Sequence, residues 1–283
     1  MTNALNFHFN VDGDDFKSAG HASFLMKKNY GQNFLVVPRV PEYIANNIGI
    51  DKDTLVIEIG PGVGALTEFL LENAKKVICY EIDKELIPIL REVFKDKDNL
   101  EVVHKDFLKV DLSKEIDFSE YKKVVVASNL PYYITSEILI RLFKEEYPFV
   151  IAAMMQKEVA HRILKSKGGK DENELTLCAK YFTDFSLLKE VSKNDFFPKP
   201  KVDSTVLLFK KKEGVSLREE YIKLIRTLYT QRRKTIWNNL KDEVESKEEL
   251  EQTLDYLKIE RTTRVEELQF NDILRLLEVV KLK

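Results

Sequence analysis

Residues 55–64 read Leu-Val-Ile-Glu-Ile-Gly-Pro-Gly-Val-Gly, an apolar run that ends in three closely spaced glycines. This pattern indicates a buried strand that turns tightly into a helix. Outward from it, amphipathic stretches such as 65–73 and 84–94 alternate with strand-like runs at 77–82, 100–103, 123–127, 150–155 and 206–209. The alternation predicts βαβ units, and therefore an α/β protein with a doubly wound, mainly parallel sheet.

The composition bounds the size and class of the protein. The chain has 283 residues, 44% hydrophobic and 33% charged, which is enough for one sizeable core and a smaller domain. No apolar run approaches the length of a membrane span, and the N-terminus lacks the basic and apolar regions of a signal peptide. We therefore expect a cytoplasmic protein without membrane association. The net charge of −2 means that any binding of nucleic acid depends on local basic patches.

Neither the cysteines nor the histidines form a metal-ligand pattern. Cys79 and Cys178 lie in apolar surroundings, far apart in sequence and outside any CxxC spacing. The four histidines are scattered without the paired spacing of a zinc site. We predict two reduced core cysteines and no bound metal.

Four motifs follow the first four predicted strands, at points that a doubly wound sheet brings to one edge. They are Glu58-Ile59-Gly60-Pro61-Gly62-Val63-Gly64, Glu81-Ile82-Asp83, Lys105-Asp106-Phe107 and Asn129-Leu130-Pro131-Tyr132. The glycine turn lets the backbone approach a ligand closely, although a tight turn without a ligand would use the same residues. The four motifs predict a ligand site at the carboxyl edge of the sheet.

The spacing of the acids indicates an adenosyl ligand. Glu81 stands 21 positions after Gly60, at the end of the next strand, where a carboxylate can accept hydrogen bonds from both hydroxyls of a ribose. Asp106 can accept from the adenine amine of the same ligand, or it can cap a helix. NAD and S-adenosylmethionine share this adenosine, so the acids alone do not choose between them.

The tetrapeptide Asn129-Leu130-Pro131-Tyr132 favours S-adenosylmethionine, because it suits methylation of a nucleobase amine. The adenine N6 amine is a poor nucleophile, since its lone pair is delocalised into the ring. Acceptors at the Asn129 side-chain oxygen and the Pro131 carbonyl would hold both N–H groups and direct the lone pair at a methyl group. Tyr132 offers a face on which an extruded adenine can stack. A nicotinamide oxidoreductase is the alternative, but no hydride-transfer site is recognisable.

Five motifs together are highly specific. They are Asn29-Tyr30-Gly31-Gln32-Asn33-Phe34-Leu35, the glycine turn, Asn129-Leu130-Pro131-Tyr132-Tyr133-Ile134, Gln156-Lys157-Glu158-Val159-Ala160 and Phe196-Phe197-Pro198-Lys199-Pro200-Lys201-Val202-Asp203-Ser204. On these residues the chain resembles, over most of 27–283, the small-subunit ribosomal RNA adenine-N6,N6-dimethyltransferases. The resemblance implies a Rossmann-like S-adenosylmethionine-dependent methyltransferase with a small all-helical C-terminal domain. It also implies dimethylation of two adjacent adenosines near the 3′ end of small-subunit (16S) rRNA, in ribosome biogenesis.

The resemblance further implies roles for particular residues. The cofactor contacts fall on Asn33, Leu35, Gly60, Gly62, Glu81, Asp106 and Asn129. Catalysis falls on Asn129, Pro131 and Tyr132, with Phe196 as a second aromatic wall opposite Tyr132 and Phe197 packed in the core. The expected contacts to RNA phosphates are Lys199, Lys201, Arg232, Arg233 and Lys234.

The implied partner is the precursor of the small ribosomal subunit with its rRNA, bound by a monomeric enzyme. The methyltransferase domain is expected over 26–210 and the helical domain over 211–283, after a flexible N-terminal extension over 1–25 that the family pattern lacks. Two alternatives stay open. Enzymes that methylate large-subunit rRNA share the cofactor motifs, and non-catalytic transcription proteins related to the family would tolerate loss of the tetrapeptide, which is intact here.

Overall fold

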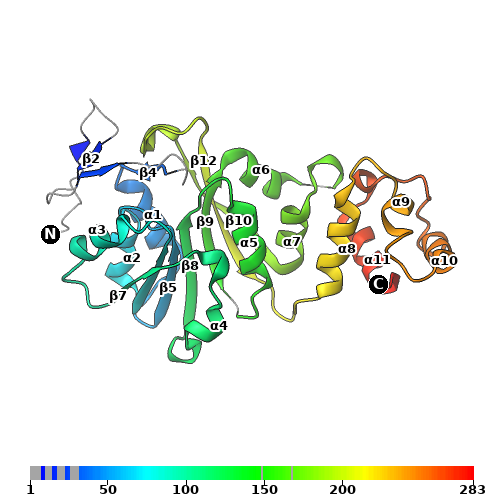
Figure 1. Cartoon of the computed structure of the whole chain (residues 1–283), viewed down its shortest axis with the longest axis horizontal. Helices are drawn as coiled ribbons and strands as arrows, with labels where there is room; N and C mark the ends of the chain where they lie inside the picture. The colour runs from blue at the N-terminus through cyan, green and yellow to red at the C-terminus, as the bar shows by residue number, and fades with distance from the viewer. Residues whose placement is uncertain (1–7, 10–14, 18–22, 26–31, 148, 167) are drawn as a thin grey trace. The chain divides into compact units, whose positions relative to one another are not determined.

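The structure is a computed structural model that describes residues 8–9, 15–17, 23–25, 32–147, 149–166 and 168–283, and its largest sheet has seven strands. Its strands are β5 (Thr54–Ile59), β6 (Lys76–Glu81), β7 (Leu100–His104), β8 (Lys123–Asn129), β9 (Val150–Gln156), β10 (Thr183–Val191) and β12 (Ser204–Lys211). They lie in the order β10-β12-β9-β8-β5-β6-β7 (Figure 1). The neighbouring strands β9, β8, β5, β6 and β7 pair in parallel, and β12 pairs antiparallel with β9. The predicted α/β fold is confirmed.

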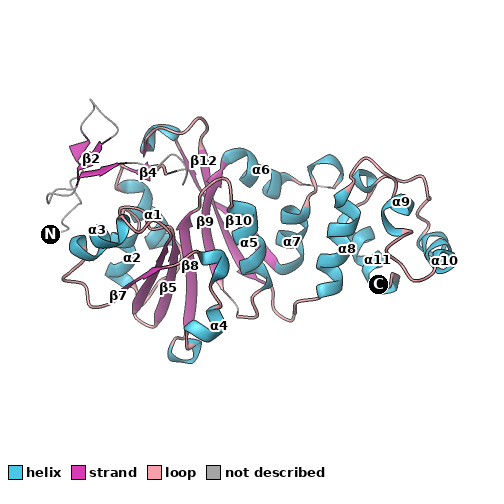
Figure 2. Cartoon of the chain, in the orientation of Figure 1, coloured by secondary structure: helices cyan, strands magenta, loops and turns pink. Residues whose placement is uncertain are grey.

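Helices connect and precede the strands (Figure 2). They are α1 (Arg39–Asn47), α2 (Thr67–Asn73), α3 (Leu86–Val93), α4 (Leu112–Glu115), α5 (Thr135–Lys144), α6 (Lys157–Lys165) and α7 (Glu174–Phe182). The strand order reverses between β5 and β8, so right-handed crossovers place the connections before and after this point on opposite faces of the sheet. A reversal of this kind leaves a crevice at the carboxyl ends of the strands.

Burial explains why the apolar runs form strands. Every residue of β5 is buried, and so are the five central residues of β8. Strands covered on both faces favour β-branched side chains such as Val56 and Val125, both of which lie in the core. The cysteines also behave as predicted, because Cys79 and Cys178 are buried and free. No helix in the described part of the chain is long and apolar enough to cross a membrane.

The chain divides into two compact units. The first holds residues 1–142, 147–160 and 185–211, and the second holds 143–146, 161–184 and 212–283. The C-terminal helices of the second unit are α8 (Glu219–Thr230), α9 (Ile236–Leu240), α10 (Lys247–Leu257) and α11 (Phe270–Val279). The predicted helical segment 211–283 thus falls almost wholly in the second unit, which also takes in α7 from the middle of the chain.

Tyrosines join α7 to the C-terminal helices. The Tyr221 side chain is fully buried, donates a hydrogen bond of 3.0 Å to the Leu177 carbonyl, and stacks on Tyr181 with ring centroids 4.0 Å apart. The apolar residues keep a helical period through 221–240, but the structure has two helices in this stretch. The hydroxyl of Thr235 accepts a hydrogen bond of 3.3 Å from the Asn238 N–H and starts α9 as a separate helix.

Short strands lie ahead of the main sheet. β1 (His8–Phe9), β2 (Asp15–Lys17) and β3 (Ser23–Leu25) pair antiparallel with one another. The rest of the segment 1–25, for which we predict a flexible extension, lies outside the described residues. β4 (Phe34–Leu35) pairs antiparallel with β11 (Phe196–Phe197), and both residues of β4 line the pocket at the carboxyl edge of the sheet.

The end of α10 holds a strained residue that gives a stability test. Lys258 has a φ of 58° and a ψ of 40°, the only positive φ of a non-glycine residue in the described part of the chain. Lys258→Gly should raise the free energy of unfolding by about 0.5–1 kcal/mol, because glycine adopts this conformation without a Cβ penalty. Urea denaturation checks the change. Lys258→Ala is the control, since it removes the charge but keeps the Cβ; equal stabilisation by both variants would contradict the conformational account.

Candidate active site

The structure brings the four predicted motifs to one pocket in the first unit. The pocket lies at the carboxyl ends of β5, β6, β7 and β8, on both sides of the point where the strand order reverses. The predicted residues that line it are Asn33, Leu35, Gly60, Gly62, Glu81, Asp106, Asn129, Pro131 and Tyr132. Phe196, Lys199 and Lys201 are not among the lining residues. Segments far apart in sequence therefore meet where an α/β sheet binds its ligand.

The glycine turn leaves room for a ligand at one position in particular. Gly60 has a φ of 65°, a left-handed conformation that side-chain-bearing residues rarely adopt. A Cβ built on Gly60 would meet no atom within 4 Å, so the space beside this residue belongs to the pocket and not to protein packing. At Gly62 a Cβ would lie 2.8 Å from the Phe34 ring, so this second glycine instead lets the residue 32–35 segment pack against the turn.

Two backbone N–H groups fix the position of the Glu81 carboxyl group. Its Oε2 accepts a hydrogen bond of 3.2 Å from the Gly62 N–H, and its Oε1 accepts one of 2.8 Å from the Asp83 N–H. Burial raises the pKa of this carboxyl, while the two backbone bonds lower it. Each oxygen retains a lone pair with which it can accept from a ligand hydroxyl. The geometry fits the predicted ribose acceptor.

Glu58 is a pocket residue that the sequence analysis did not single out. Its side chain is almost fully buried at the end of β5, where Oε2 accepts hydrogen bonds from the Thr67 hydroxyl at 2.6 Å and the Cys79 thiol at 3.5 Å. Burial raises the pKa of Glu58 to about 7, against the lowering effect of these two donors. An ionisable residue inside an otherwise apolar strand is the signal that could have identified it.

Asp106 combines the two roles that the sequence left open. Its Oδ1 accepts a hydrogen bond of 3.1 Å from the Leu108 N–H and so caps the short 3-10 helix Phe107–Lys109. The same residue lines the pocket. Phe107, also a lining residue, is buried and packs edge-on against Tyr80 with ring centroids 5.6 Å apart. The cap therefore fixes both Asp106 and the apolar wall that follows it.

The segment Gln32–Leu35 crosses the edge of the sheet and is bonded to it. The Gln32 amide donates to Asp83 Oδ2 at 3.1 Å, and the Asn33 carbonyl accepts from the Asn129 side-chain amide at 3.0 Å. Leu35 is 5% exposed and belongs to the core. The rest of the predicted motif, Asn29 to Gly31, lies outside the described residues.

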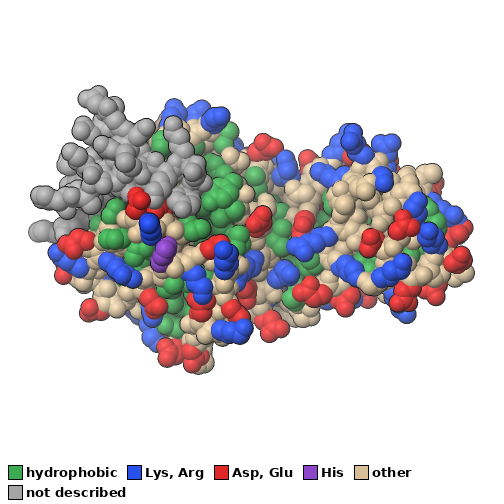
Figure 3. Space-filling model, viewed as in Figure 1, with side chains coloured by type: hydrophobic (Ala, Val, Ile, Leu, Met, Phe, Trp, Pro, Cys, Tyr) green, Lys and Arg blue, Asp and Glu red, His purple; other side chains and the backbone are tan. Residues whose placement is uncertain are grey.

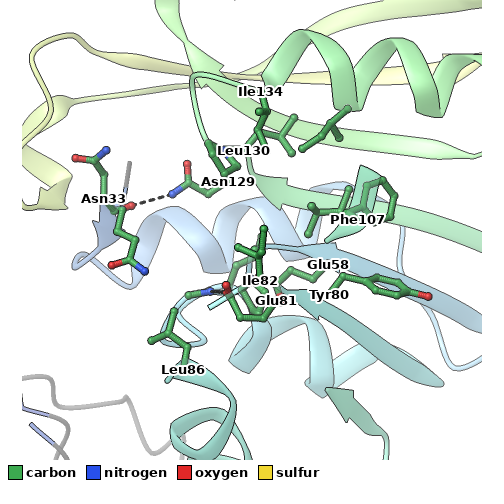
Figure 4. A pocket seen from close by; sticks show the side chains of 18 of the residues that line it. Asn33, Glu58, Tyr80, Glu81, Ile82, Leu86, Phe107, Asn129, Leu130 and Ile134 are labelled. Carbon is green, nitrogen blue, oxygen red and sulfur yellow. Dashed lines mark hydrogen bonds between the residues drawn. The ribbon is translucent and has the colours of Figure 1, made fainter. Parts of the chain in front are cut away.

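The bond to Asn33 orients the side chain of Asn129. Since the amide NH2 group donates to the Asn33 carbonyl, the oxygen Oδ1 is turned the other way (Figure 4). The assignment of nitrogen and oxygen follows from this hydrogen bond. Asn129 is thus an oriented acceptor at the pocket, as amine binding requires.

The prediction that the Pro131 carbonyl holds the target amine does not fit the structure. This carbonyl accepts hydrogen bonds from the Thr135 hydroxyl at 2.9 Å and from the Ile134 N–H at 3.2 Å. Both lone pairs are therefore used to start α5. The neighbouring carbonyl of Leu130 accepts no hydrogen bond from the described residues, and Leu130 lines the pocket. Pro131 shapes the turn, and Leu130 is the better-placed acceptor.

Tyr132 and Phe196 differ in accessibility. The Tyr132 hydroxyl lies 2.8 Å from Ser204 Oγ, which anchors the half-buried ring at the pocket. Phe196 is 3% exposed and lies in the core, whereas its neighbour Phe197 is partly exposed. This corrects the expectation that Phe196 lines the base pocket and Phe197 the core. Pairing of β11 with β4 and the alternation of side chains along a strand turn Phe196 inward.

Two further exposed residues line the pocket. Ile82 is 43% exposed and Tyr133 is 58% exposed, which is unusual for large apolar side chains. They directly follow Glu81 and Tyr132 in the sequence. This position next to predicted ligand residues is the sequence feature that could have identified them as pocket residues.

The predicted RNA contacts fall into two groups. In the first unit, Lys199 and Lys201 are exposed on the segment between β11 and β12. In the second unit, Arg233 and Lys234 are exposed. Arg232 is different, because its guanidinium donates to the carbonyls of Lys170 at 2.7 Å and Glu172 at 2.8 Å. Within the described residues, no group of three or more His, Cys, Asp or Glu side chains is arranged to hold a metal.

The sheet, with a glycine turn and free space at its reversal point, matches the Rossmann-like fold of S-adenosylmethionine-dependent methyltransferases. Within this class, the family model described as ribosomal RNA adenine dimethylase matches residues 23–282. The chain belongs to this family of ribosomal RNA adenine dimethylases. The predicted family and enzyme class are confirmed, and the nicotinamide alternative is excluded.

Individual relatives agree with the family. The chain is 41% identical over 256 residues to ribosomal RNA small subunit methyltransferase A of Geobacillus thermodenitrificans, covering 87% of each chain. A solved dimethyladenosine transferase from Plasmodium falciparum superposes with a TM-score of 0.71 at 27% identity, over 87% of this chain and 99% of that one. The solved 23S rRNA methyltransferase ErmE gives 0.64 at 26% identity, over 87% and 99%.

Proposed function

We propose that this chain dimethylates the N6 amines of two adjacent adenosines near the 3′ end of small-subunit (16S) rRNA, as a cytoplasmic monomer acting on a precursor of the small subunit. The observation that carries this is the oriented Asn129 oxygen in a glycine-lined pocket. The name of the 41% identical relative supports the small subunit as the source of the substrate. In this proposal residues 26–210 form the methyltransferase domain and 211–283 the helical domain.

The pocket residues fit S-adenosylmethionine. The open space at Gly60 accommodates a ligand close to the backbone, and the anchored Glu81 carboxylate can accept from its ribose hydroxyls. Asn33, Leu35, Gly62 and Asp106 complete the proposed binding site. When bound, S-adenosylmethionine supplies an electrophilic methyl group attached to a cationic sulfur.

The chain's own residues prepare the amine. Asn129 Oδ1 and the Leu130 carbonyl each accept one N–H of the adenine N6 amine, which draws its lone pair out of conjugation with the ring. The Tyr132 ring stacks on the extruded base, with its hydroxyl fixed on Ser204. No side chain has to remove a proton before transfer, because the methylated amine is acidic and loses its proton to solvent. A monomethylated amine still has one N–H for an acceptor to hold, so a second transfer is possible and a third is not.

The first test concerns Glu81. Glu81→Ala removes the proposed ribose acceptor and should weaken S-adenosylmethionine binding by about 1–3 kcal/mol, the range for leaving a buried hydrogen-bonding group without its partner. Titration calorimetry measures the change. Glu72→Ala, at an exposed position on α2, is the control and should bind normally. Unchanged affinity of Glu81→Ala would remove this residue from the cofactor site.

The function itself is tested by the choice of substrate. Purified protein with S-adenosylmethionine should methylate small subunits that lack the modification, and it should leave isolated large subunits unmodified. Large subunits are the relevant comparison because the fold is also similar to that of a 23S rRNA methyltransferase. Methylation of the large subunit alone would show that the substrate is large-subunit rRNA and not small-subunit rRNA.

A further inference from the structure

A buried acid beside the pocket links two of the segments that form it. Asp83 is 1% exposed and is not among the described residues that line the pocket. Its N–H donates to the Glu81 carboxylate at 2.8 Å, and its Oδ2 accepts from the Gln32 side-chain amide at 3.1 Å. Its Oδ1 accepts from the Glu85 N–H at 3.1 Å, which fixes the turn that leads into α3. Asp83 therefore joins the proposed ribose acceptor to the segment that crosses the edge of the sheet.

The bond to Gln32 is one of two anchors on either side of Asn33. Gln32 is held by Asp83, and the two residues that follow Asn33 form β4, which pairs antiparallel with β11. Because the chain is fixed at both neighbours of Asn33, the backbone of this residue has little freedom to rotate. The Asn33 carbonyl therefore has a defined position and direction.

The position of this carbonyl determines the orientation of Asn129. The Asn33 carbonyl accepts from the Asn129 side-chain amide at 3.0 Å, and this bond turns the Asn129 oxygen the other way (Figure 4). The contacts thus form a continuous path from Glu81 through Asp83, Gln32 and Asn33 to Asn129. The proposed acceptor for the cofactor lies at one end of this path, and the proposed acceptor for the target amine lies at the other.

We propose that Asp83 is a positioning residue for methyl transfer. Through Gln32 and Asn33 it holds Asn129 in the orientation that accepts the adenine amine, and through its N–H it holds the Glu81 carboxylate. This proposal rests on the proposed function, because Asn129 accepts an amine only in that reaction. Misplacing a reacting group by about 1 Å can slow a reaction by about 100-fold, so a residue that contacts neither substrate nor cofactor can control turnover.

The hydrogen bond between Gln32 and Asp83 can be broken and then rebuilt in the opposite direction. Gln32→Glu places a second carboxylate within hydrogen-bond distance of the first, where the two groups repel and neither can donate. Adding Asp83→Asn restores a donor and an acceptor, because the new amide can donate to the new carboxylate while its oxygen still accepts from Glu85. The double variant keeps the net charge of the unchanged protein, since one substitution adds a negative charge and the other removes one.

The first experiment measures methyl transfer in a single turnover, with unmethylated small subunits and S-adenosylmethionine both saturating. Gln32→Glu should slow transfer by about 10–100-fold, the scale for a misplaced reacting group. Asp83→Asn alone should slow it less, because the Gln32 amide can rotate and offer its oxygen to the new amide. The double variant should recover most of the loss caused by Gln32→Glu. Gln32 itself lines the pocket, so a double variant as slow as Gln32→Glu would indicate direct contact of Gln32 with the cofactor and overturn the role of Asp83.

Gln252→Glu is the matched control for the added charge. It makes the same substitution at an exposed position on α10, in a region where acidic and basic side chains are interspersed (Figure 3). It should transfer the methyl group as fast as the unchanged protein. Circular dichroism melting confirms that all the variants are folded.

The second experiment determines whether the effect depends on Asn129. Asn129→Ala already lacks the oriented oxygen, so adding Gln32→Glu to it should slow transfer little further. Substitutions that act through one shared contact are not additive, whereas independent ones are. A further loss as large as the loss that Gln32→Glu causes in the unchanged protein would show that it acts elsewhere, and would overturn the proposed path to Asn129.

The outcomes distinguish this role from the function on which it rests. If the unchanged protein methylates small subunits and Gln32→Glu does so equally fast, the role of Asp83 is overturned and the function stands. If the unchanged protein does not methylate small subunits, both are overturned. The expected result is a slow Gln32→Glu variant, recovery when Asp83→Asn is added, and little further loss when Gln32→Glu is combined with Asn129→Ala.

Discussion

Asn129→Ala should reduce turnover by roughly 10²–10³, the scale for loss of one preorganised polar contact at a reacting centre. The Asn129 amide donates to the Asn33 carbonyl, so its oxygen is fixed before the substrate arrives. An acceptor that holds the amine only in the reactive geometry acts mainly on the transition state. The loss should therefore appear in the rate of methyl transfer and much less in substrate affinity.

Binding of small subunits should survive this substitution, because the exposed cations remain in place. Single-turnover kinetics beside a subunit-binding assay separates the two effects. Asn47→Ala, which deletes an exposed side chain at the end of α1, is the control and should behave like the unchanged protein. Near-normal methyl transfer by Asn129→Ala would exclude the assigned role, and lost subunit binding would make Asn129 a structural residue.

Glu58→Gln should stabilise the protein at alkaline pH by about 3 kcal/mol, since one pKa unit corresponds to about 1.4 kcal/mol. Burial raises the pKa of Glu58 from 4.5 to about 7. A raised pKa in the folded state means that the contribution of this residue to stability is complete below pH 4.5 and is lost as the pH rises through 7. Glutamine fills the same space without a charge and removes this loss.

Urea denaturation at pH 5 and pH 8.5 measures the effect in the absence of cofactor. We expect the variant to exceed the unchanged protein by about 3 kcal/mol at pH 8.5 and by about 1 kcal/mol or less at pH 5. Glu72→Gln, at an exposed position, should show no such difference between the two pH values. A stability difference that is the same at both pH values would show that Glu58 does not titrate in this range.

The predictable part of the fold depends on long apolar runs. The run at 55–59 and the other five predicted strands all occur, and each end of a strand lies within two residues of its predicted position. β10 was missed because its polar and apolar residues alternate irregularly, as its mixed burial shows. The break between α8 and α9 was missed because it depends on a cap by Thr235, while the helical period of the apolar residues continues across it.

The candidate site was predictable where backbone topology determines position. Gly60, Glu81, Asp106 and Asn129 end neighbouring strands, so the sheet alone brings them together. Roles that depend on hydrogen bonds were not predictable. The Pro131 carbonyl accepts a hydrogen bond from Thr135, and the Arg232 guanidinium donates to the carbonyls of Lys170 and Glu172. On β11, Phe196 is the residue whose side chain faces the core. No spacing in the sequence indicates these contacts.

The account is tested most directly by mass spectrometry of small-subunit rRNA after incubation of unmethylated subunits with this protein and S-adenosylmethionine. It predicts two adjacent N6,N6-dimethyladenosines near the 3′ end with the unchanged protein, and almost none with Asn129→Ala in the same time. Methylation at another base, a reaction that stops at one methyl group on each adenosine, or full activity of Asn129→Ala would contradict it.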